Sequence, residues 1–327
     1  MNPNIVLDAI KPKASADKKW RASVPSKEVI GCVYETSLPD GESTFVELKK
    51  QLQQQTKEFF SQKKINGTRR KLLPPTSGSF NNCNGRWLEY IFAVYAWNAV
   101  AEVNQSCPNT DPYIYVKLPN NTTTDTPDQE DRTTISWTSI LDEAHSNRIM
   151  RKKGDLLEGS ESKLEASNPD AVILQLPKEV CPEEFSPYSK IENISVQTQS
   201  RIDHLFFKCL NKICQLDQIV AFISVKASTR SDRRYQFIVE GNSTKGLYAA
   251  AFSHESNFKV GKLIENKYFA FSLEPSKAAD HDALDDLIMF ASLFNEAVGS
   301  TRAIDALYNC EKPSEVALKI KEICTQP

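Results

Sequence analysis

The stretch from Ile219 to Glu240, IVAFISVKASTRSDRRYQFIVE, constrains the fold of this chain more than any other. Six of its first seven residues are apolar, and the run is rich in β-branched and aromatic side chains, a composition that predicts a buried β-strand. The strand ends at Lys226, and the polar and charged residues 228–234 follow before apolar residues return. Such a pattern suits a catalytic edge, and it equally suits a strand followed by a solvated basic turn. The rest of the chain must decide between the two.

Composition allows a large core, and the net charge restricts how the chain could bind an anionic partner such as nucleic acid. The chain has 327 residues, of which 40% are hydrophobic and 25% charged, so it forms either one large domain or two smaller ones. The formal net charge is −2. A nucleic-acid-binding protein with this charge must concentrate its basic residues locally, because affinity for phosphates follows the local patch.

Cysteine usage and hydropathy favour a cytoplasmic protein with no membrane partner. The eight cysteines are scattered, none forms a Cys-x-x-Cys pair, and only four histidines are present, so we do not expect a zinc site. Scattered cysteines with apolar neighbours suit a reducing compartment. The first twenty residues lack an apolar signal segment, and no apolar run approaches the roughly 20 residues that span a bilayer.

The order of segments predicts an N-terminal arm, residues 1–42, followed by a single domain, residues 43–327. The arm is polar and punctuated by proline, and we expect it to be irregular apart from a short strand near Val29–Val33. Residues 43–64 have a helical pattern, and the basic loop that follows either contacts phosphates or is solvated. Strands are expected at 113–118 and 267–273, and helices at 137–157, 195–215, 281–298, 301–309 and 313–324.

Two further segments carry acidic residues beside apolar runs. Residues 84–104 are apolar almost all round, which predicts a buried helix with Glu89 in its first turn. Glu89 then either complements the helix dipole or places a carboxylate at the edge of a cleft. Pro169-Asp170 precedes a short buried strand, Ala171–Leu176, and Asp170 is either a turn residue or a carboxylate at the strand entry. We expect this strand to lie beside the strand that ends at Lys226.

Taken together, these features resemble the CCGG-family type II restriction endonucleases. The general nuclease pattern is Pro-Asp, a spacer, and then Asp/Glu-x-Lys, but here Ser224 occupies the position of the second acid. The resembling family has the same departure, and a glutamate from the following helix, here Glu240, supplies the missing carboxylate. The resemblance covers about residues 85–246. It implies an α+β fold of the restriction-endonuclease type, with a central mixed five-stranded β-sheet flanked by helices.

The resemblance also implies the chemistry of phosphodiester hydrolysis with Mg²⁺ as cofactor. Asp170 and Glu240 are the expected metal ligands, joined by the carbonyl of Val225 and by Glu89, because Mg²⁺ prefers hard oxygen ligands. Lys226 is expected to orient or help deprotonate the attacking water and to stabilise the phosphate.

An Arg-x-Asp-Arg element follows the lysine, and the resemblance implies that it reads the core bases. Arg230 and Arg233 would bind guanines and Asp232 a cytosine, since arginine forks match guanine in the major groove. Arg234 is either a phosphate contact or a solvated charge, and Gln236 would reach a flanking base. The implied partners are double-stranded DNA and further copies of the chain, as a homodimer or homotetramer. Cleavage before the first C of CCGG would leave four-base 5′ overhangs.

Three alternatives stay open on the sequence. The chain could be a nuclease of the same fold with a different GC-rich target, or a catalytically inactive DNA-binding module. It could also be an unrelated cytoplasmic enzyme. The acidic cluster argues against a binding module, because carboxylates that face phosphates without a metal are repelled by them. The absence of a Gly-x-Gly-x-x-Gly motif or a phosphate-binding loop argues against the unrelated enzyme.

Overall fold

The computed structural model describes fourteen segments of the chain, and the structural statements below concern these residues. They are 4–5, 21–23, 29–31, 34–38, 41–62, 77–118, 137–149, 169–181, 186–205, 210, 212–228, 231–252, 267–274 and 303–325. The helices are α1 (Phe45–Gln62), α2 (Ser77–Ser106), η2 (Trp137–Ile140), η3 (Lys178–Val180), α4 (Val196–Leu205), η5 (Leu216–Gln218), α5 (Ser231–Phe252) and α8 (Pro313–Thr325). The strands are β1 (Asn4–Ile5), β2 (Arg21–Ser23), β3 (Val29–Gly31), β4 (Tyr34–Ser37), β5 (Tyr113–Lys117), β6 (Ala171–Gln175), β7 (Asn193–Ile194), β8 (Ile219–Lys226), β9 (Lys267–Ser272) and β10 (Ala306–Asn309).

A five-stranded mixed sheet forms the centre of the molecule, in the order β10-β9-β8-β6-β5. Strand β8 is the middle strand, parallel to β9 and antiparallel to β6. Strands β5 and β6 are antiparallel, whereas β9 and β10 are parallel. A strand buried on both faces is expected to be mostly apolar, which explains the composition of residues 219–225 apart from Ser224. The prediction of a central mixed five-stranded sheet flanked by helices is confirmed.

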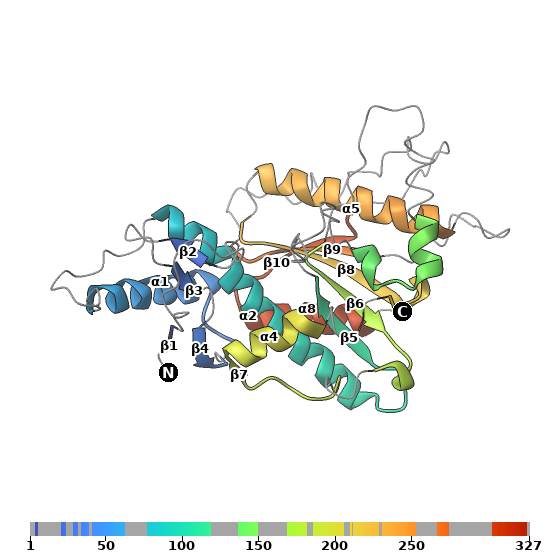
Figure 1. Ribbon diagram of the computed structural model, residues 1–327, viewed down its shortest axis with the longest axis horizontal. Coiled ribbons are helices and arrows are strands. Elements are labelled where there is room, and N and C mark those ends of the chain that lie inside the picture. Colours follow the sequence, from blue (N-terminus) through green and yellow to red (C-terminus); the bar gives the residue numbers. More distant parts are fainter. Residues whose placement is uncertain are drawn as a thin grey trace, which may run out of the picture.

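Helices cover both faces of this sheet (Figure 1). On one face the ring of Phe92 in α2 packs edge-on against Phe271 of β9, with centroids 5.0 Å apart. On the other face Tyr248 of α5 packs edge-on against Phe222 of β8, at 6.3 Å. Alternate residues of a strand point to opposite faces, so Phe222, Ser224 and Lys226 share the α5 face. This alternation directs the lysine predicted from sequence toward α5.

Several predicted boundaries are wrong. Helix α2 begins at Ser77, so Glu89 lies more than three turns inside it and not in the first turn. Residues 306–309 form the edge strand β10 and not a helix, because they pair in parallel with β9. Within the predicted helix 137–157, residues 137–140 form a 3₁₀-helix and residues 143–149 are helical, while the remainder from residue 150 lies outside the described residues. The predicted helix 281–298 and the basic loop after α1 also lie outside them.

The N-terminal arm contains more regular structure than expected. Strands β2 and β3 pair antiparallel, and β1 and β4 join β7 in a small three-stranded sheet. Strand β7 comes nearly 160 residues after β4, so this sheet ties the arm to the main body of the chain. The prediction of an irregular arm with a single strand is therefore wrong for these stretches.

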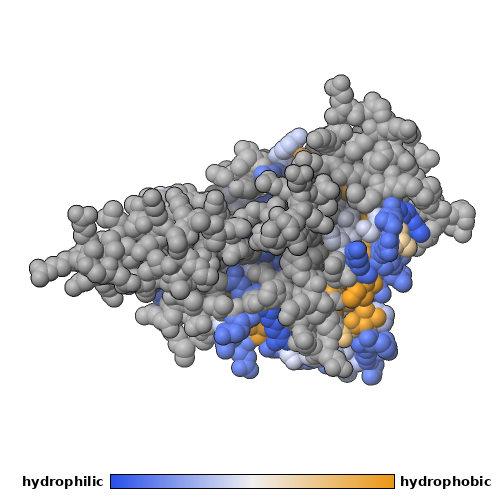
Figure 2. All heavy atoms as spheres, viewed as in Figure 1, coloured by the Kyte–Doolittle hydropathy of each residue, from blue (hydrophilic) through white to orange (hydrophobic). Residues whose placement is uncertain are grey.

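The outer surface carries few large apolar side chains among the described residues. Figure 2 shows described residues that are mostly hydrophilic on one face, with one hydrophobic area among them on the right. Across the part of the chain that the structure describes, no helix is long and apolar enough to span a bilayer.

Candidate active site

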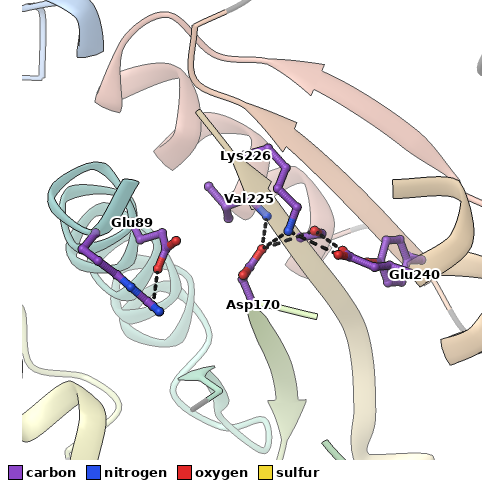
Figure 3. Close-up of polar contacts among 8 residues, drawn as sticks. Glu89, Asp170, Val225, Lys226 and Glu240 are labelled. Carbon is purple, nitrogen blue, oxygen red and sulfur yellow. Dashed lines mark hydrogen bonds and ion pairs between the residues drawn. The ribbon is translucent and has the colours of Figure 1, made fainter. Parts of the chain in front are cut away.

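The ends of two neighbouring strands bring Asp170 beside Lys226. In the antiparallel pair, Ala171 of β6 lies opposite Ile223 of β8, so the residue before β6 lies next to the last residues of β8. The Asp170 Oδ2 atom accepts a hydrogen bond from the Val225 backbone N–H at 2.6 Å. It also lies 3.3 Å from the Lys226 Nζ atom (Figure 3). The juxtaposition predicted from two separate sequence segments is therefore present in the structure.

Glu240 reaches the same lysine from the tenth residue of α5. Its Oε1 atom lies 3.4 Å from the Lys226 Nζ atom, so the ammonium group stands between two carboxylates. The side chains of Lys226, Asp170 and Glu240 are only 14–15% exposed. Ion pairs in such a setting are screened far less than pairs at the surface.

Ser224, which replaces the expected acid, connects the two carboxylates. Its Oγ atom lies 2.7 Å from Glu240 Oε2 and 3.2 Å from Asp170 Oδ2. The Ser224 side chain is fully buried, and the small hydroxyl leaves room for the glutamate that enters from α5. A hydroxyl has one proton to donate, so Ser224 serves one carboxylate at a time. The serine thus couples the two acids without adding a third negative charge.

Burial and mutual charge shift the ionisation of the cluster. Burial raises the pKa of Glu240 above its ordinary value, and the neighbouring Asp170 adds to this effect, against the opposing pull of Lys226. Burial alone would lower the pKa of Lys226, but the carboxylates of Asp170 and Glu240 outweigh it and raise that pKa. The lysine therefore holds its proton at neutral pH, and the cluster has one cation that partly neutralises two acids.

Glu89 points from α2 toward this cluster, as Figure 3 shows, but it has a different partner. Its Oε2 atom accepts a hydrogen bond from Arg86 Nη1 at 3.0 Å, one turn earlier in the same helix. Burial raises the pKa of Glu89, and the charges of Lys117 and Arg86 oppose that shift. Lys117 of β5 is itself only 5% exposed, and its Nζ atom lies 5.3 Å from the centre of the Tyr90 ring.

The predicted reading residues fall at the start of α5. Asp232, Arg233 and Arg234 belong to its first turn, and Gln236 follows as an exposed residue of the same helix. Arg230 lies outside the described residues. Asp232, Arg233, Arg234 and Gln236 thus belong to the same continuous helix as Glu240.

The oxygen ligands at this site fit a hard divalent cation. Among the residues that the structure describes, no group of three or more His, Cys, Asp and Glu side chains could hold a metal ion. Asp170 and Glu240 provide two carboxylates, and the Val225 carbonyl points to the side of β8 on which its N–H meets Asp170. Mg²⁺ is commonly bound through one or two carboxylates while it keeps several water ligands. Two carboxylates and a carbonyl therefore suffice for such an ion.

The fold and the comparisons define the class of this protein. The mixed sheet with flanking helices is the restriction-endonuclease fold, and it superposes on the Bse634I restriction endonuclease with a TM-score of 0.69 and 27% sequence identity, over 89% of this chain and 88% of that one. A family model described as Cfr10I/Bse634I restriction endonuclease matches residues 9–326. The chain belongs to the Cfr10I/Bse634I restriction endonuclease family.

One further relative and a second structure of Bse634I agree with this assignment. The type II restriction enzyme Cfr10I of Citrobacter freundii is 32% identical over 176 residues, which cover 53% of this chain and 54% of that enzyme. The match thus spans about half the length of Cfr10I. The Type IIF restriction endonuclease Bse634I with cognate DNA superposes with a TM-score of 0.66 and 26% identity, over 88% of each chain. The resemblance inferred from sequence is confirmed at the level of the family.

Sequence reasoning missed one residue that contacts the cluster, Tyr268, and one that acts on Glu89 through its charge, Lys117. The hydroxyl of Tyr268 in β9 donates to Glu240 Oε2 at 3.2 Å, and the side chain is fully buried. Burial raises the pKa of Tyr268 well above its ordinary value, so the hydroxyl remains a donor. Lys117 adds positive charge beside Glu89. Each lies in a predicted strand, but no motif marks either position, because their neighbours at the site come from distant segments of the chain.

Proposed function

We propose that this protein is a type II restriction endonuclease that makes Mg²⁺-dependent double-strand cuts in DNA at a palindromic site with a CCGG core. Cleavage falls before the first C and leaves 5′-CCGG overhangs. The observation that carries the proposal is the cluster at the end of β8, where Lys226 lies between Asp170 and Glu240 and Ser224 stands in place of an acid. Family membership supports site-specific DNA cleavage.

The roles of the residues follow from the charges at the site. Asp170 and Glu240, with the carbonyl of Val225, hold the metal, and Glu89 is a further carboxylate on its approach. When bound, Mg²⁺ neutralises charge on the phosphate and polarises a water. Lys226, which keeps its proton beside two carboxylates, donates to a phosphate oxygen and orients the attacking water. Asp170 and Glu240 hold the lysine in place from two sides.

The start of α5 supplies the reading of sequence. Arg230 and Arg233 bind guanines and Asp232 accepts from a cytosine amino group, since a CCGG core presents only G·C pairs. Arg234 contacts a phosphate, and Gln236, which is exposed on α5, reaches a flanking base. Because Glu240 lies on the same helix, correct docking of the reading segment also sets the distance from the cluster to the phosphate.

A palindromic target requires two active sites related by a two-fold axis, so the functional form is a homodimer or a homotetramer built from such dimers. We propose that residues 43–327 form one endonuclease domain and that residues 1–42 extend the contact to flanking sequence or to the minor groove. Removal of residues 1–40 should then lower specificity or affinity for flanking bases. Unchanged cutting and specificity in the truncated protein would refute the role of the arm.

Digestion of a plasmid of known sequence tests the function directly. Purified protein is incubated with Mg²⁺, with EDTA in parallel, and the ends of the fragments are sequenced; a Lys226→Met preparation controls for contaminating nucleases. Discrete fragments with 5′-CCGG overhangs, in Mg²⁺ only, are the expected result. Discrete cuts elsewhere would keep the nuclease and refute the base assignment. No cutting on substrates with one or two CCGG sites in every flanking context would refute the activity.

A further inference from the structure

We propose that Tyr268 is a positioning residue of the active site, which orients the carboxylate of Glu240 so that one oxygen is held by the protein and the other faces Lys226 and the metal. This inference rests on the proposed function. It concerns a residue of β9 that lies outside every motif considered above.

Two hydroxyl groups converge on a single oxygen of Glu240. Ser224 Oγ lies 2.7 Å and Tyr268 Oη 3.2 Å from Oε2, whereas Oε1 lies on the side of Lys226, 3.4 Å from its Nζ atom. Hydrogen bonds from hydroxyls to a carboxylate are charge-assisted and stronger than neutral ones. Glu240 is a residue of α5, and its side chain has several rotatable bonds. The two donors that hold Oε2 therefore determine the direction in which Oε1 points.

Tyr268 is itself held in place through its backbone. Its N–H donates to Asp305 Oδ2 at 2.6 Å, and its carbonyl accepts from the Asp305 N–H at 2.8 Å. The ring is fully buried, in parallel register with Phe222 of β8. Since both the backbone and the ring are fixed, the hydroxyl occupies a defined point relative to β8, and it is suited to aim another side chain.

The same region also fixes α5 next to Glu240. Lys245, only 1% exposed, pairs with Asp305 Oδ2 at 2.6 Å, so one carboxylate binds both α5 and the backbone of Tyr268. At Gly241 an added Cβ would lie 2.2 Å from the carbonyl oxygen of Ala303, so the helix approaches this segment more closely than any other residue allows. Residues 303–305 therefore contact both α5 and the backbone of Tyr268, which fixes the two relative to each other. The Tyr268 hydroxyl then restricts the remaining rotation of the Glu240 side chain.

The hydrogen bond from Tyr268 to Glu240 also has a purely structural interpretation, because a buried tyrosine hydroxyl needs a hydrogen-bond partner in any protein. Tyr248 of α5 offers a matched comparison. It is also buried, at 5% exposure, and its hydroxyl donates to the Leu216 carbonyl at 3.1 Å, away from the cluster. Tyr268→Phe and Tyr248→Phe each remove one buried hydroxyl that donates one hydrogen bond, and only the first of these bonds is to Glu240.

The test compares both variants with the wild type in three measurements. These are the thermal midpoint without metal, Mn²⁺ affinity by calorimetry without DNA, and the single-turnover cleavage rate against Mg²⁺ concentration. We expect similar losses of thermal midpoint in the two variants. Only Tyr268→Phe should weaken Mn²⁺ binding, by about five- to tenfold for one hydrogen bond, and raise the Mg²⁺ concentration that gives the half-maximal rate.

Equal Mn²⁺ affinity and equal Mg²⁺ dependence in the two variants would overturn the inference and leave Tyr268 as a structural residue. The calorimetry also separates this inference from the proposed function. If the wild type cleaves no DNA, the function is refuted, and the difference in Mn²⁺ affinity between the two variants still decides whether Tyr268 positions Glu240.

Discussion

Helices α2 and α5 lie on opposite faces of the sheet, and each sends a glutamate toward Lys226, but the two glutamates are held in different ways. Glu240 of α5 contacts Ser224 and Lys226 of β8 and Tyr268 of β9. Glu89 of α2 is paired with Arg86, a residue of its own helix. The first glutamate is thus part of a network that joins helix and sheet, whereas the second is held within one element.

This difference separates a carboxylate that belongs to the network around Lys226 from one that acts on that network through its charge. Removal of Glu240 would change the partners of Ser224, Tyr268 and Lys226 together. Removal of Glu89 would leave the network around Lys226 intact and alter mainly the local charge, since Glu89 acts on Asp170 and Lys226 through electrostatics. Residues that act as one unit are not additive when substituted, whereas independent residues are.

The largest effect is expected within the network. Lys226→Met and Glu240→Gln should each lower the single-turnover cleavage rate by about a thousandfold, within the range for a positioned catalytic group. Asp170→Ala and Lys226→Ala should abolish cutting in the same way. The Lys226→Met/Glu240→Gln double variant should be little worse than either single one, because both belong to one unit.

Gel-shift assays with Ca²⁺ in place of Mg²⁺ provide the control, since each of these variants should still bind CCGG-containing DNA specifically. Full cleavage by Glu240→Gln would show that α5 does not replace the missing acid. Multiplicative losses in the double variant would place Glu240 outside the network and remove the contrast with Glu89.

The next effect concerns the arginines at and just before the start of α5, which we propose to read bases. Arg233→Ala, and likewise Arg230→Ala, should weaken binding to the specific site by about 1–3 kcal/mol, the discrimination expected of a bidentate arginine–guanine contact. Arg234→Ala is the matched neighbour, and it should weaken binding to all sequences alike and reduce the salt dependence. Competition assays with site-containing and site-free duplexes measure both. An equal loss on the two duplexes for Arg233→Ala would refute base reading by this helix.

A smaller effect is expected for the glutamate of α2. Glu89→Gln keeps the shape of the side chain and removes its charge, and we expect the cleavage rate to fall by about tenfold, because one nearby charge is changed while the metal ligands are kept. The loss should multiply with that of Glu240→Gln, unlike the pair within the network. A loss as deep as that of Glu240→Gln, and without multiplication, would make Glu89 a member of the same unit.

The contrast between the two helices also explains what sequence could predict. The sequence predicts the strand that begins after Asp170 and the strand that ends at Lys226, because apolar runs bounded by proline or charged residues indicate buried strands. The start of the helix that carries Glu89 could not be predicted, because residues 77–83, SGSFNNC, have low helix propensity although they belong to α2. Strand β10 was misread since four residues carry little periodic signal. The sequence identifies Ser224 only as a residue that replaces the expected acid of the nuclease motif. Tyr268 lies near Glu240 because β9 pairs with β8, and local sequence does not predict that pairing.

The smallest effect is on stability, and it again distinguishes the two glutamates. Burial raises the pKa of Glu89 above its ordinary value of 4.5, so the folded state disfavours the ionised form even though Arg86 is near. For a raised pKa the native state is most stable below the unfolded value, and that stability is lost as the pH rises through the folded value. Glu89→Gln never ionises, so it should be more stable than the wild type at pH 7, and equal to it near pH 4.

Thermal melts in EDTA at a series of pH values measure this difference. We expect Glu89→Gln to have the higher thermal midpoint at pH 7 and the same midpoint as the wild type near pH 4. Lys117→Met serves as the opposite control: loss of that buried cation should raise the pKa of Glu89 further and lower the stability at pH 7 relative to pH 4. A Glu89→Gln variant that is less stable than the wild type at pH 7 would show that the Arg86 ion pair outweighs burial. Glu89 would then stabilise α2 through its ion pair with Arg86, and burial of its carboxylate would carry no net cost in stability.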